Sequence, residues 1–389
     1  MMGHCYAIFS VRFDPLVGGV ESYTLNLARE LKQQGDDVIV ITKRITNSPE
    51  IETRQDGIVV VRLPTVSLIN NRLPLSFRNR RHHDLLKHVA GMNVDRVLVN
   101  NRFYPHSIDG LIFAKSLNLP AIMLDHGSAY LTLGKPIIDW LIKCYEHIMT
   151  MRAKRFRPLF CGVSAKSTEW LKTFGIQTEY VIPNSIDADS FRNEASARDF
   201  RTELNVNEND VLVAFVGRLT PEKGCDVLVR VANSFENDQI VFVLAGDGTM
   251  RDELTTKAGK NVHFLGIINH SDLSALMRDA DVFCLPTRSE GFCTSLLEAS
   301  AWATPSIITD VGGVQEVIGD QSCGIIIQDM TDASVQDGLK QLLGLKPTQR
   351  RELGMRSYAR VTKHCTWHES VLALQRAFEQ AENNLRERQ

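Results

Sequence analysis

The chain alternates short, continuous apolar segments with amphipathic segments along nearly its whole length. The first apolar segment, Tyr6–Phe9, is followed by the glycine turn Gly18-Gly19 and then by apolar side chains spaced three and four residues apart from Val20 to Leu31. Such spacing is typical of an amphipathic helix. Continuous rather than alternating apolar strands favour parallel sheets that are covered on both faces. The pattern therefore predicts an α/β protein with doubly wound sheets.

A polar region divides the predicted strands into two series. Residues 184–209 have little strand character and predict a linker with a short helix, and the tail from Asp332 to Arg386 is predicted to be helical. The sequence thus predicts two doubly wound domains joined near residue 185, with a ligand site in a cleft where the strand ends face each other. The predicted strands are Tyr6–Phe9, Asp37–Thr42, Ile58–Leu63, Arg96–Val99, Ala121–Leu124, Leu159–Val163, Glu179–Ile182, Leu212–Val216, Ile240–Ala245, His263–Leu265, Asp281–Leu285, Ser306–Thr309 and Gly324–Ile327.

Charge and cysteine usage narrow the class of protein. Residues 1–190 hold 23 Lys and Arg against 18 Asp and Glu, whereas the other residues hold 21 against 28, which suggests different partners for the two halves. None of the eight cysteines lies in a CxxC motif, so buried free thiols are favoured over disulfides or zinc. The sequence shows neither a secretory signal nor an apolar run of about 18 residues. We therefore expect a cytoplasmic protein.

Residues 216–224 (VGRLTPEKG) carry the first pattern with a chemical meaning. They follow a predicted strand and open a helix, and Arg218 and Lys223 flank the turn. Two cations beside the amide groups of a helix start suit a phosphate or diphosphate, although an isolated Arg or Lys in a loop is more often simply solvated. Neither a G-x-G-x-x-G nor a Walker A motif is present, so dinucleotide redox chemistry and P-loop phosphoryl transfer lose their main support.

Residues 289–299 (SEGFCTSLLEA) carry the second pattern, again directly after a predicted strand. Glu290 lies in the loop and Glu298 lies early in the next helix. Each glutamate alone would be interpreted as a solvated side chain or as a partner of the helix dipole. The pair at this spacing favours a site in which carboxylates bind sugar or ribose hydroxyls while backbone amides face a phosphate.

These motifs together resemble the retaining GT-B glycosyltransferases of family 4, and the resemblance covers nearly the whole chain. It implies two Rossmann-like domains facing a central cleft: an acceptor-binding domain at residues 1–185, a donor-binding domain at 186–370, and a C-terminal helix at 371–389 that crosses back to the first domain. The matching motifs are GGVE at 18–21, DHG at 125–127, VS at 163–164, IPNSID at 182–187, VGRLTPEKG at 216–224, AGDG at 245–248, E-x7-E at 290–298 and ATPSIITDVGGVQEVI at 303–318.

The resemblance implies catalytic roles for four matched positions. Arg218 and Lys223 would neutralise the diphosphate of a nucleotide-sugar donor, and Glu290 would contact hydroxyls of the donor sugar. His126 would lie near the anomeric carbon. A lone histidine in a D-H-G turn is more often structural, but its position after a strand that faces the cleft favours a site role.

Further matched positions would bind the donor. Gly18 and Gly19 would bring backbone amides close to it, and Glu298 would contact the ribose. Cys293, Ser185 and Trp302-Ala303 depart from the common family pattern, which affects the expected sugar and acceptor preference rather than activity. The predicted donor-binding residues are Gly18, Gly19, Gly217, Phe292, Cys293, Thr294, Ser295 and Glu298.

Two basic clusters lie in the first half of the chain, in residues 72–88 and in residues 152–157. They suit either solvated helix faces or a surface for an anionic membrane or a lipid-diphosphate acceptor, and the family's frequent use of lipid-linked acceptors favours the second interpretation. Nucleic acid is disfavoured, because the clusters lack interleaved aromatic residues and the chain is mildly acidic. The basic residues are Arg72, Arg78, Arg80, Arg81 and Lys87, and Arg152, Lys154, Arg155 and Arg157.

We therefore expect a retaining hexosyltransferase that moves a sugar from a UDP- or GDP-linked donor to a hydroxyl of a glycan or of a lipid-linked acceptor. Its place would be in polysaccharide or glycolipid synthesis, in the cytoplasm or peripherally on the inner face of the cell membrane. Two cations can stabilise a departing diphosphate and no D-x-D motif is present, so we expect no metal and no cofactor beyond the donor. The alternatives are a nucleotide-sugar epimerase or hydrolase on the same fold, or a non-catalytic nucleotide-sugar-binding protein.

Overall fold

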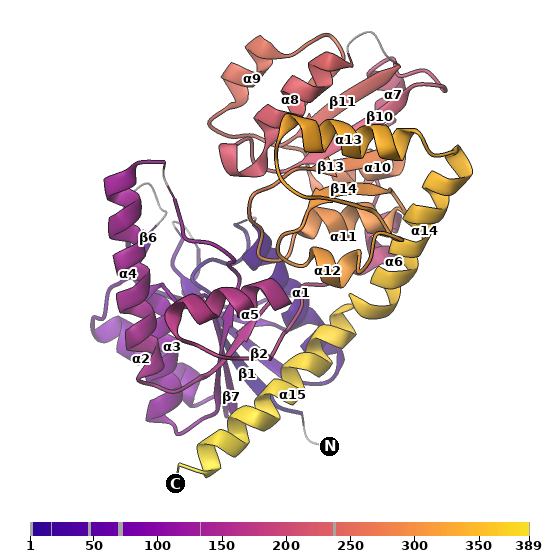
Figure 1. Cartoon of the computed structure of the whole chain (residues 1–389). Coiled ribbons are helices and arrows are strands. Elements are labelled where there is room, and N and C mark those ends of the chain that lie inside the picture. Colours follow the sequence, from indigo (N-terminus) through magenta and orange to yellow (C-terminus); the bar gives the residue numbers. More distant parts are fainter. Residues whose placement is uncertain are drawn as a thin grey trace. The chain divides into compact units, whose positions relative to one another are not determined.

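The computed structural model describes residues 3–388 apart from residues 17, 46–47, 69–72, 133 and 236–238. The chain divides into two compact units (Figure 1). The N-terminal unit contains residues 1–184 and 367–389, and the C-terminal unit contains residues 185–366. The chain therefore leaves the first unit after Asn184 and returns to it at Trp367, at the start of the last helix. Each unit is built on its own sheet.

The N-terminal unit has a seven-stranded sheet in the order β3-β4-β2-β1-β7-β8-β9. All neighbouring pairs are parallel except β3 and β4. The strands β5 (Thr65–Leu68) and β6 (Leu73–Ser76) form a separate two-stranded sheet. The strands of the main sheet are β1 (Cys5–Phe9), β2 (Asp37–Lys43), β3 (Ile51–Thr53), β4 (Val59–Leu63), β7 (Arg96–Asn100), β8 (Ala121–Asp125) and β9 (Leu159–Gly162).

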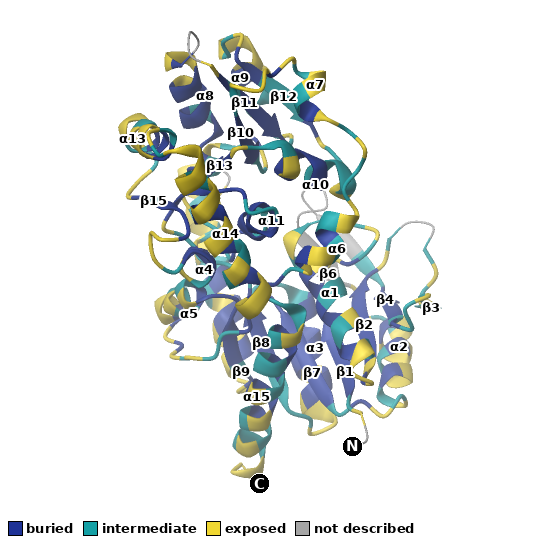
Figure 2. Cartoon of the chain, turned by 90° about the vertical axis from the view of Figure 1, so that its right-hand side faces the viewer, coloured by how far each residue is buried: buried dark blue, intermediate teal, exposed yellow. Residues whose placement is uncertain are grey.

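Helices cover this sheet in two layers (Figure 1). The helix α1 packs against α15 in one layer, and α3 packs against α4 in the other. Strands β1 and β7 are buried along their whole length, as the dark blue ribbons of Figure 2 show. The helices are α1 (Gly19–Gln33), α2 (Arg80–Ala90), α3 (Pro105–Ser116), α4 (Pro136–Lys154), α5 (Ala165–Leu171) and α15 (Trp367–Arg386).

The C-terminal unit has a six-stranded, all-parallel sheet in the order β12-β11-β10-β13-β14-β15. Its strands are β10 (Val211–Val216), β11 (Ile240–Ala245), β12 (Val262–Gly266), β13 (Val282–Leu285), β14 (Ser306–Thr309) and β15 (Ile325–Ile327). Its α-helices are α6 (Ala188–Asn193), α7 (Phe200–Glu203), α8 (Cys225–Ser234), α9 (Arg251–Lys257), α10 (His270–Asp279), α11 (Thr294–Ala301), α12 (Val314–Val317), α13 (Asp332–Leu343) and α14 (Pro347–His364).

The two predicted parallel-sheet units are confirmed, with three local differences. Glu179–Ile182 is not a strand, because this segment makes only an isolated bridge between Val181 and Gly162. The strand β3 and the β5–β6 pair were not predicted. The polar region 184–209 contains two short helices, α6 and α7, rather than one. All eight cysteines are free, and seven of them are buried.

The last helix, α15, supplies part of the core of the N-terminal unit. Leu374 and Phe378 are fully buried. The ring of Phe378 meets the ring of Tyr6 edge-on at 5.6 Å, and the guanidinium of Arg96 lies 5.3 Å from the Phe378 ring centroid. Arg96 also forms an ion pair of 2.9 Å with Glu382 on the same helix. The final helix is therefore an integral part of the first unit.

Phe378→Ala should lower the free energy of unfolding of the N-terminal unit by about 3–5 kcal/mol, because it removes a fully buried ring and leaves a cavity. Native-state hydrogen exchange of the β1 and β8 amides measures this loss. Glu379→Ala, at the exposed neighbouring position, is the matched control and should change protection little. Unchanged protection in Phe378→Ala would contradict the role assigned to α15.

Candidate functional site

Two loops meet at the carboxyl edge of the C-terminal sheet, where β10 and β13 lie side by side. The loop after β10 carries Lys223 and the loop after β13 carries Glu290, and these two side chains form an ion pair in which both are largely buried. The backbone N–H of Arg288 donates to the carbonyl of Glu222 at 2.8 Å, and the Thr287 hydroxyl donates to the same carbonyl at 3.1 Å. The pair therefore lies on two loops that are fixed to each other.

Two glycines permit this close approach of the loops. Gly224 has a φ of 66°, and a Cβ at this position would lie 1.9 Å from the carbonyl oxygen of Pro286. Gly246, after β11, has a φ of 140°, and its Cβ would lie 1.9 Å from the carbonyl oxygen of Gly217. Any other residue at either position would clash with backbone atoms. The loops after β10, β11 and β13 are thus packed closely against one another. They lie where the strand order of the sheet changes direction, between β10 and β13, and ligands bind at this place in open α/β sheets.

Arg218 lies near this pair but points outward. Its side chain is 68% exposed, and its Nη2 lies 3.4 Å from Oε1 of Glu222. The structure therefore supplies one cation that is compensated by a carboxylate and one that is mostly in water. An incoming diphosphate could reach both kinds of cation from the carboxyl edge, since phosphate oxygens accept charge-assisted hydrogen bonds from either.

The helix α11 begins at this same edge. Cys293 precedes it with a φ of 76°, an unusual conformation for a non-glycine residue, and Thr294 and Ser295 form its first turn. Burial raises the pKa of the Cys293 thiol to about 12, so it is a packing group and not a nucleophile. Phe292 is buried, and its carbonyl accepts a hydrogen bond of 3.1 Å from the N–H of Gly313.

Glu298 lies within α11 and is only 9% exposed. Burial raises its carboxyl pKa from 4.5 to about 7. The carboxyl that was predicted to contact the ribose therefore changes charge near neutral pH. Glu290, in contrast, has Lys223 as an ion-pair partner. Lys223, Glu290 and the start of α11 lie on one edge of the C-terminal sheet, as predicted.

The other predicted residues belong to the N-terminal unit. His126 follows β8, and its Nε2 lies 3.0 Å from Oδ1 of Asn100, whose Nδ2 donates to Oγ1 of Thr24 at 2.9 Å. The rings of Tyr23 and His126 form a T-shaped contact with their centroids 4.8 Å apart. Burial lowers the His126 pKa to about 3, so the ring is neutral. With Asn100 donating to Thr24, this network assigns the His126 proton to Nε2 and leaves Nδ1 as the acceptor.

The glycine pair after β1 lies at the start of α1. Gly18 is the N-cap residue of α1 in an extended conformation, and Gly19 is the first helical residue. A Cβ at Gly19 would meet no atom within 4 Å, so open space lies beside this backbone. Arg12 and Glu21 form an ion pair of 2.9 Å nearby. Gly18, Gly19 and His126 thus lie after strands β1 and β8, which flank β7 in the sheet.

A buried ion triad beside His126 was not predicted. Arg102 is 1% exposed and contacts Oε2 of Glu146 at 2.8 Å and Oδ1 of Asp125 at 3.6 Å. Its guanidinium also lies 3.8 Å from the ring centroid of Phe174. Asp125 directly precedes His126, so Arg102 helps to position the candidate catalytic loop. Arg102 and Glu146 are 44 residues apart in sequence, and no local pattern connects them.

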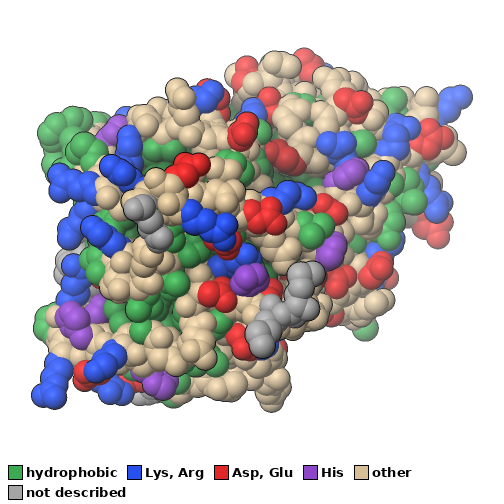
Figure 3. All heavy atoms as spheres, turned by 90° about the horizontal axis from the view of Figure 1, so that it is seen from below, with side chains coloured by type: hydrophobic (Ala, Val, Ile, Leu, Met, Phe, Trp, Pro, Cys, Tyr) green, Lys and Arg blue, Asp and Glu red, His purple; other side chains and the backbone are tan. Residues whose placement is uncertain are grey.

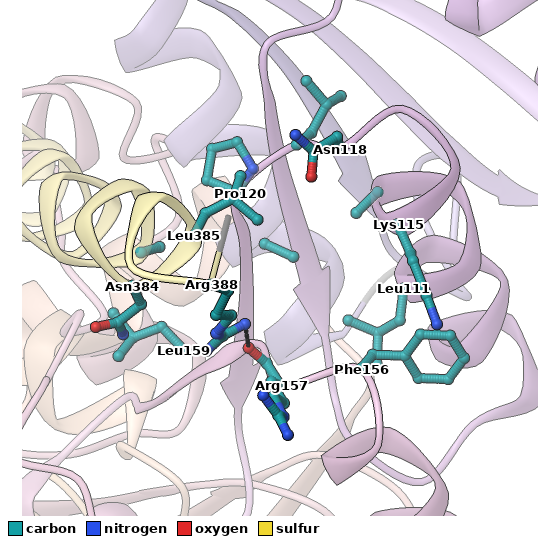
Figure 4. A pocket seen from close by; sticks show the side chains of 14 residues that line it. Leu111, Lys115, Asn118, Pro120, Phe156, Arg157, Leu159, Asn384, Leu385 and Arg388 are labelled. Carbon is teal, nitrogen blue, oxygen red and sulfur yellow. Dashed lines mark hydrogen bonds between the residues drawn. The ribbon is translucent and has the colours of Figure 1, made fainter.

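A cavity of about 90 Å³ in the N-terminal unit lies away from these residues (Figure 4). It is lined by Ala121 and Leu159, the first residues of β8 and β9, so it lies at the amino ends of the strands. Arg388 donates to the carbonyl of Arg157 at its rim, at 2.9 Å. His126 lies at the opposite, carboxyl edge. Among the described residues, no cluster of three or more His, Cys, Asp or Glu side chains could hold a metal ion.

Two Rossmann-like units in one chain, each with polar residues at its strand ends, match the GT-B fold. Sucrose-phosphate synthase from Thermosynechococcus elongatus has a similar structure, with a TM-score of 0.77 and 20% identity over 98% of this chain and 100% of that one. HepE from Anabaena in complex with UDP gives a TM-score of 0.71 and 18% identity over 98% of this chain and 100% of that one.

Sequence comparisons identify the family. "Glycosyltransferase Family 4" matches residues 17–190, and "Glycosyl transferases group 1" matches residues 196–360. D-inositol 3-phosphate glycosyltransferase of Nocardia farcinica is 26% identical over 91% of this chain and 84% of that protein. The same-named protein of Jonesia denitrificans is 24% identical over 97% of this chain and 96% of that protein. The chain belongs to the family 4 glycosyltransferases of the GT-B fold.

Glu298 should make stability depend on pH in a predictable direction. Its pKa is about 7 in the folded state and near 4.5 in the unfolded state, so the folded state retains a proton that the unfolded state has lost between these values. Its contribution to the free energy of unfolding is greatest below pH 4.5 and falls by about 3 kcal/mol as pH rises through 7. Urea denaturation of Glu298→Gln and of the parent across this range measures the difference.

The Glu298→Gln variant should lack this loss and gain stability over the parent as pH rises. Glu208→Gln, at an exposed position, is the matched control and should follow the parent. A parallel pH dependence in the parent and in Glu298→Gln would show that Glu298 is not the group that titrates.

Proposed function

We propose that the protein is a retaining glycosyltransferase that moves a hexosyl group from a nucleoside-diphosphate sugar to a hydroxyl of a glycan or lipid-linked acceptor. The observation that carries this proposal is the Lys223–Glu290 pair, which lies with Arg218 on the fixed loops of the C-terminal unit. The cations suit a diphosphate and the carboxylate suits sugar hydroxyls. Family membership supplies the reaction class, and the chemistry of these loops supplies the donor class.

The proposed donor is UDP- or GDP-linked and is held by the C-terminal unit. Lys223 and Arg218 would bind the diphosphate, and Glu290 would accept hydrogen bonds from the sugar. Glu298 would accept from the ribose, and the start of α11 with Gly217 would place backbone amides near the phosphates. Two structurally similar proteins support a uridine nucleotide: HepE was solved with UDP-glucose, and trehalose-6-phosphate synthase from E. coli with UDP-2-fluoro glucose.

The proposed reaction breaks the bond between the anomeric carbon and the donor phosphate oxygen while the acceptor oxygen forms a new bond on the same face. The acceptor's proton moves to the departing phosphate oxygen, and Lys223 and Arg218 stabilise the negative charge that develops on the diphosphate. His126, which is neutral, would position groups near the anomeric carbon by hydrogen bonding rather than by charge. Catalysis would depend mainly on holding two substrates in place.

The acceptor and the cellular setting also remain proposals: a glycan or lipid-linked acceptor in polysaccharide or glycolipid synthesis, at the inner face of the membrane. The two predicted basic clusters differ as membrane contacts. In residues 72–88, Arg72 lies outside the described residues, Arg78 contacts the buried Asp109 at 2.6 Å, and Arg81 contacts Glu50 at 2.5 Å. Several of these cations are therefore already compensated. In the second cluster, Lys154 donates to the carbonyls of Phe174 and Gly175, and Arg152, Arg155 and Arg157 are exposed. The second cluster is therefore the better candidate.

The experiment that tests the proposal starts with a thermal-shift screen of nucleotides and nucleotide sugars, followed by product analysis of the best donor with and without acceptors. Net sugar transfer to an acceptor, with the donor's anomeric configuration kept, is the expected result. Conversion of the donor alone into an epimer, or hydrolysis that no acceptor diverts, would favour the alternative enzymes. Tight nucleotide binding without any turnover would favour a binding protein.

Arg218→Ala and Lys223→Ala should each lower turnover by roughly 10²–10³, the effect of removing one preorganised charge-stabilising donor. Steady-state kinetics with the identified donor measures the effect. Arg351→Ala, which removes an exposed cation from α14, is the matched control and should retain activity. Lys223→Ala leaves the largely buried Glu290 without its cation, so its folding is checked by circular dichroism. Activity close to that of the parent in both variants would refute the proposed diphosphate site.

Chelator should leave sugar transfer largely intact, because the proposed charge stabilisation comes from Lys223, Arg218 and backbone amides rather than from a metal. The measurement compares initial rates with and without EDTA. If EDTA abolishes activity and Mg²⁺ or Mn²⁺ restores it, the stabilising charge has been assigned to the wrong groups.

A further inference from the structure

The helix α4 carries an apolar stripe on the side that faces away from the N-terminal unit. Its buried residues, Glu146, Met149, Thr150 and Ala153, form the inward face. The opposite stripe consists of large apolar side chains that are 54–77% exposed: Ile137, Trp140, Leu141, Ile148 and Met151. These positions recur at helical spacing, so they line one face of the helix.

This stripe is not typical of the rest of the surface. Thirteen large apolar side chains are exposed in the described part of the chain, and seven of them lie between Leu131 and Met151. Single exposed apolar residues need no explanation, but a contiguous group on one helix face marks a surface that contacts another body. None of the helices in the described ranges is long and apolar enough to cross a bilayer.

Cations lie at both ends of the stripe. Residues 135–157 contain six Lys and Arg against two acidic residues. Both acidic side chains are engaged: Glu146 is buried against Arg102, and Asp139 accepts a hydrogen bond of 2.7 Å from Thr132. The exposed charges are those of Lys135, Lys143, Arg152, Lys154, Arg155 and Arg157. In Figure 3, blue Lys and Arg side chains surround green hydrophobic ones along the left-hand edge, the side on which α2 and α4 lie in Figure 1.

We propose that the outward face of α4 is a docking surface for an anionic lipid bilayer, with the stripe from Ile137 to Met151 immersed at the level of the headgroups and the flanking cations on the lipid phosphates. A helix with an apolar face, a tryptophan and flanking Lys and Arg has the composition of an interfacial membrane helix. The proposal assigns membrane contact chiefly to α4 rather than to residues 72–88, and it does not depend on the nature of the sugar donor.

Charge complementarity favours lipid over a second copy of the chain. In a two-fold pairing of α4 helices, like-charged groups would meet, because both ends of the stripe carry cations: Lys135 at one end and Arg152 and Arg155 at the other. Like-charge contacts of this kind oppose association. An anionic bilayer offers phosphates to Lys135, Arg152 and Arg155 and also accepts the apolar side chains, so one occupant accounts for both features.

The test is co-sedimentation of the full chain with vesicles of phosphatidylcholine alone and of equal parts phosphatidylcholine and phosphatidylglycerol. The parent should bind the anionic vesicles more tightly, and rising salt should weaken this binding because it screens the cations. A double variant that carries both Ile137→Ser and Trp140→Ser should bind the anionic vesicles about tenfold more weakly or worse, since it lacks two large apolar side chains. The double variant Arg152→Ser, Arg155→Ser should lower this binding by roughly 25-fold, at about fivefold for each cation.

Matched controls separate docking from damage to the fold. Ile267→Ser removes an 82% exposed isoleucine outside α4 and should bind vesicles like the parent. All variants should keep the parent's thermal stability and nucleotide affinity, because the changed side chains lie on the outside of the N-terminal unit or, for Ile267, on the surface of the other unit. In the parent, Trp fluorescence should shift to shorter wavelength on anionic vesicles, and Trp140→Phe should lose most of that shift while still binding.

Three outcomes would overturn the proposal. The first is equally weak binding of the parent to both kinds of vesicle, and the second is binding of the α4 variants as tight as that of Ile267→Ser. The third is a dimer of the parent in sedimentation velocity that Ile137→Ser, Trp140→Ser converts to a monomer, which would assign the stripe to contact between copies. Loss of vesicle binding with normal sugar transfer to a water-soluble acceptor supports the docking surface, whereas absence of any transfer concerns the proposed function alone.

Discussion

The central strands of both sheets are parallel and buried, and this constraint determines where polar chemistry can lie. The strands β10 and β13 are built of apolar side chains, and a charge placed along them would lose its hydration without compensation. Charged residues therefore gather in the loops at the strand ends. The chain leaves β10 and β13 through two loops that meet at the carboxyl edge, where the strand order reverses and ligands bind in open α/β sheets. Lys223 and Glu290 meet here for that reason.

The same burial separates the charged groups of the candidate site into three kinds. The Arg218 side chain is mostly exposed, Lys223 and Glu290 form a largely buried ion pair, and burial shifts the pKa of two further groups towards their neutral forms. Burial raises the pKa of Glu298 to about 7 and lowers that of His126 to about 3. Positive charge is thus held on loops at the surface of the C-terminal unit, whereas His126 offers a neutral hydrogen-bonding ring. This distribution of charge suits the binding and departure of an anion. It does not favour proton transfer by His126, whose pKa of about 3 keeps the ring neutral.

The sequence predicts the two sheets well because a continuous apolar run followed by a helical pattern has few other stable solutions. It also predicts which loops carry the site, since strand ends are visible in the same pattern. It fails where pairing depends on the assembled fold. Glu179–Ile182 has strand-like composition but makes a single bridge, and the three residues of β3 are too few to give a pattern. The ion pairs of Arg102, Arg78 and Arg81 join residues that are far apart in the chain, so those cations could not be distinguished from solvated ones.

The helix α4 shows this limit most clearly and connects two parts of the molecule. It is apolar around much of its circumference, so its periodicity alone does not reveal which face is inward. The structure resolves this through Glu146, whose carboxylate on the inner face contacts Arg102, which in turn contacts Asp125 beside His126. The outer face, opposite Glu146, is the proposed lipid surface. Three buried side chains therefore join the helix that would lie on the bilayer to the loop that carries the candidate catalytic histidine, and a lipid-linked acceptor held at that bilayer would have a fixed relation to both.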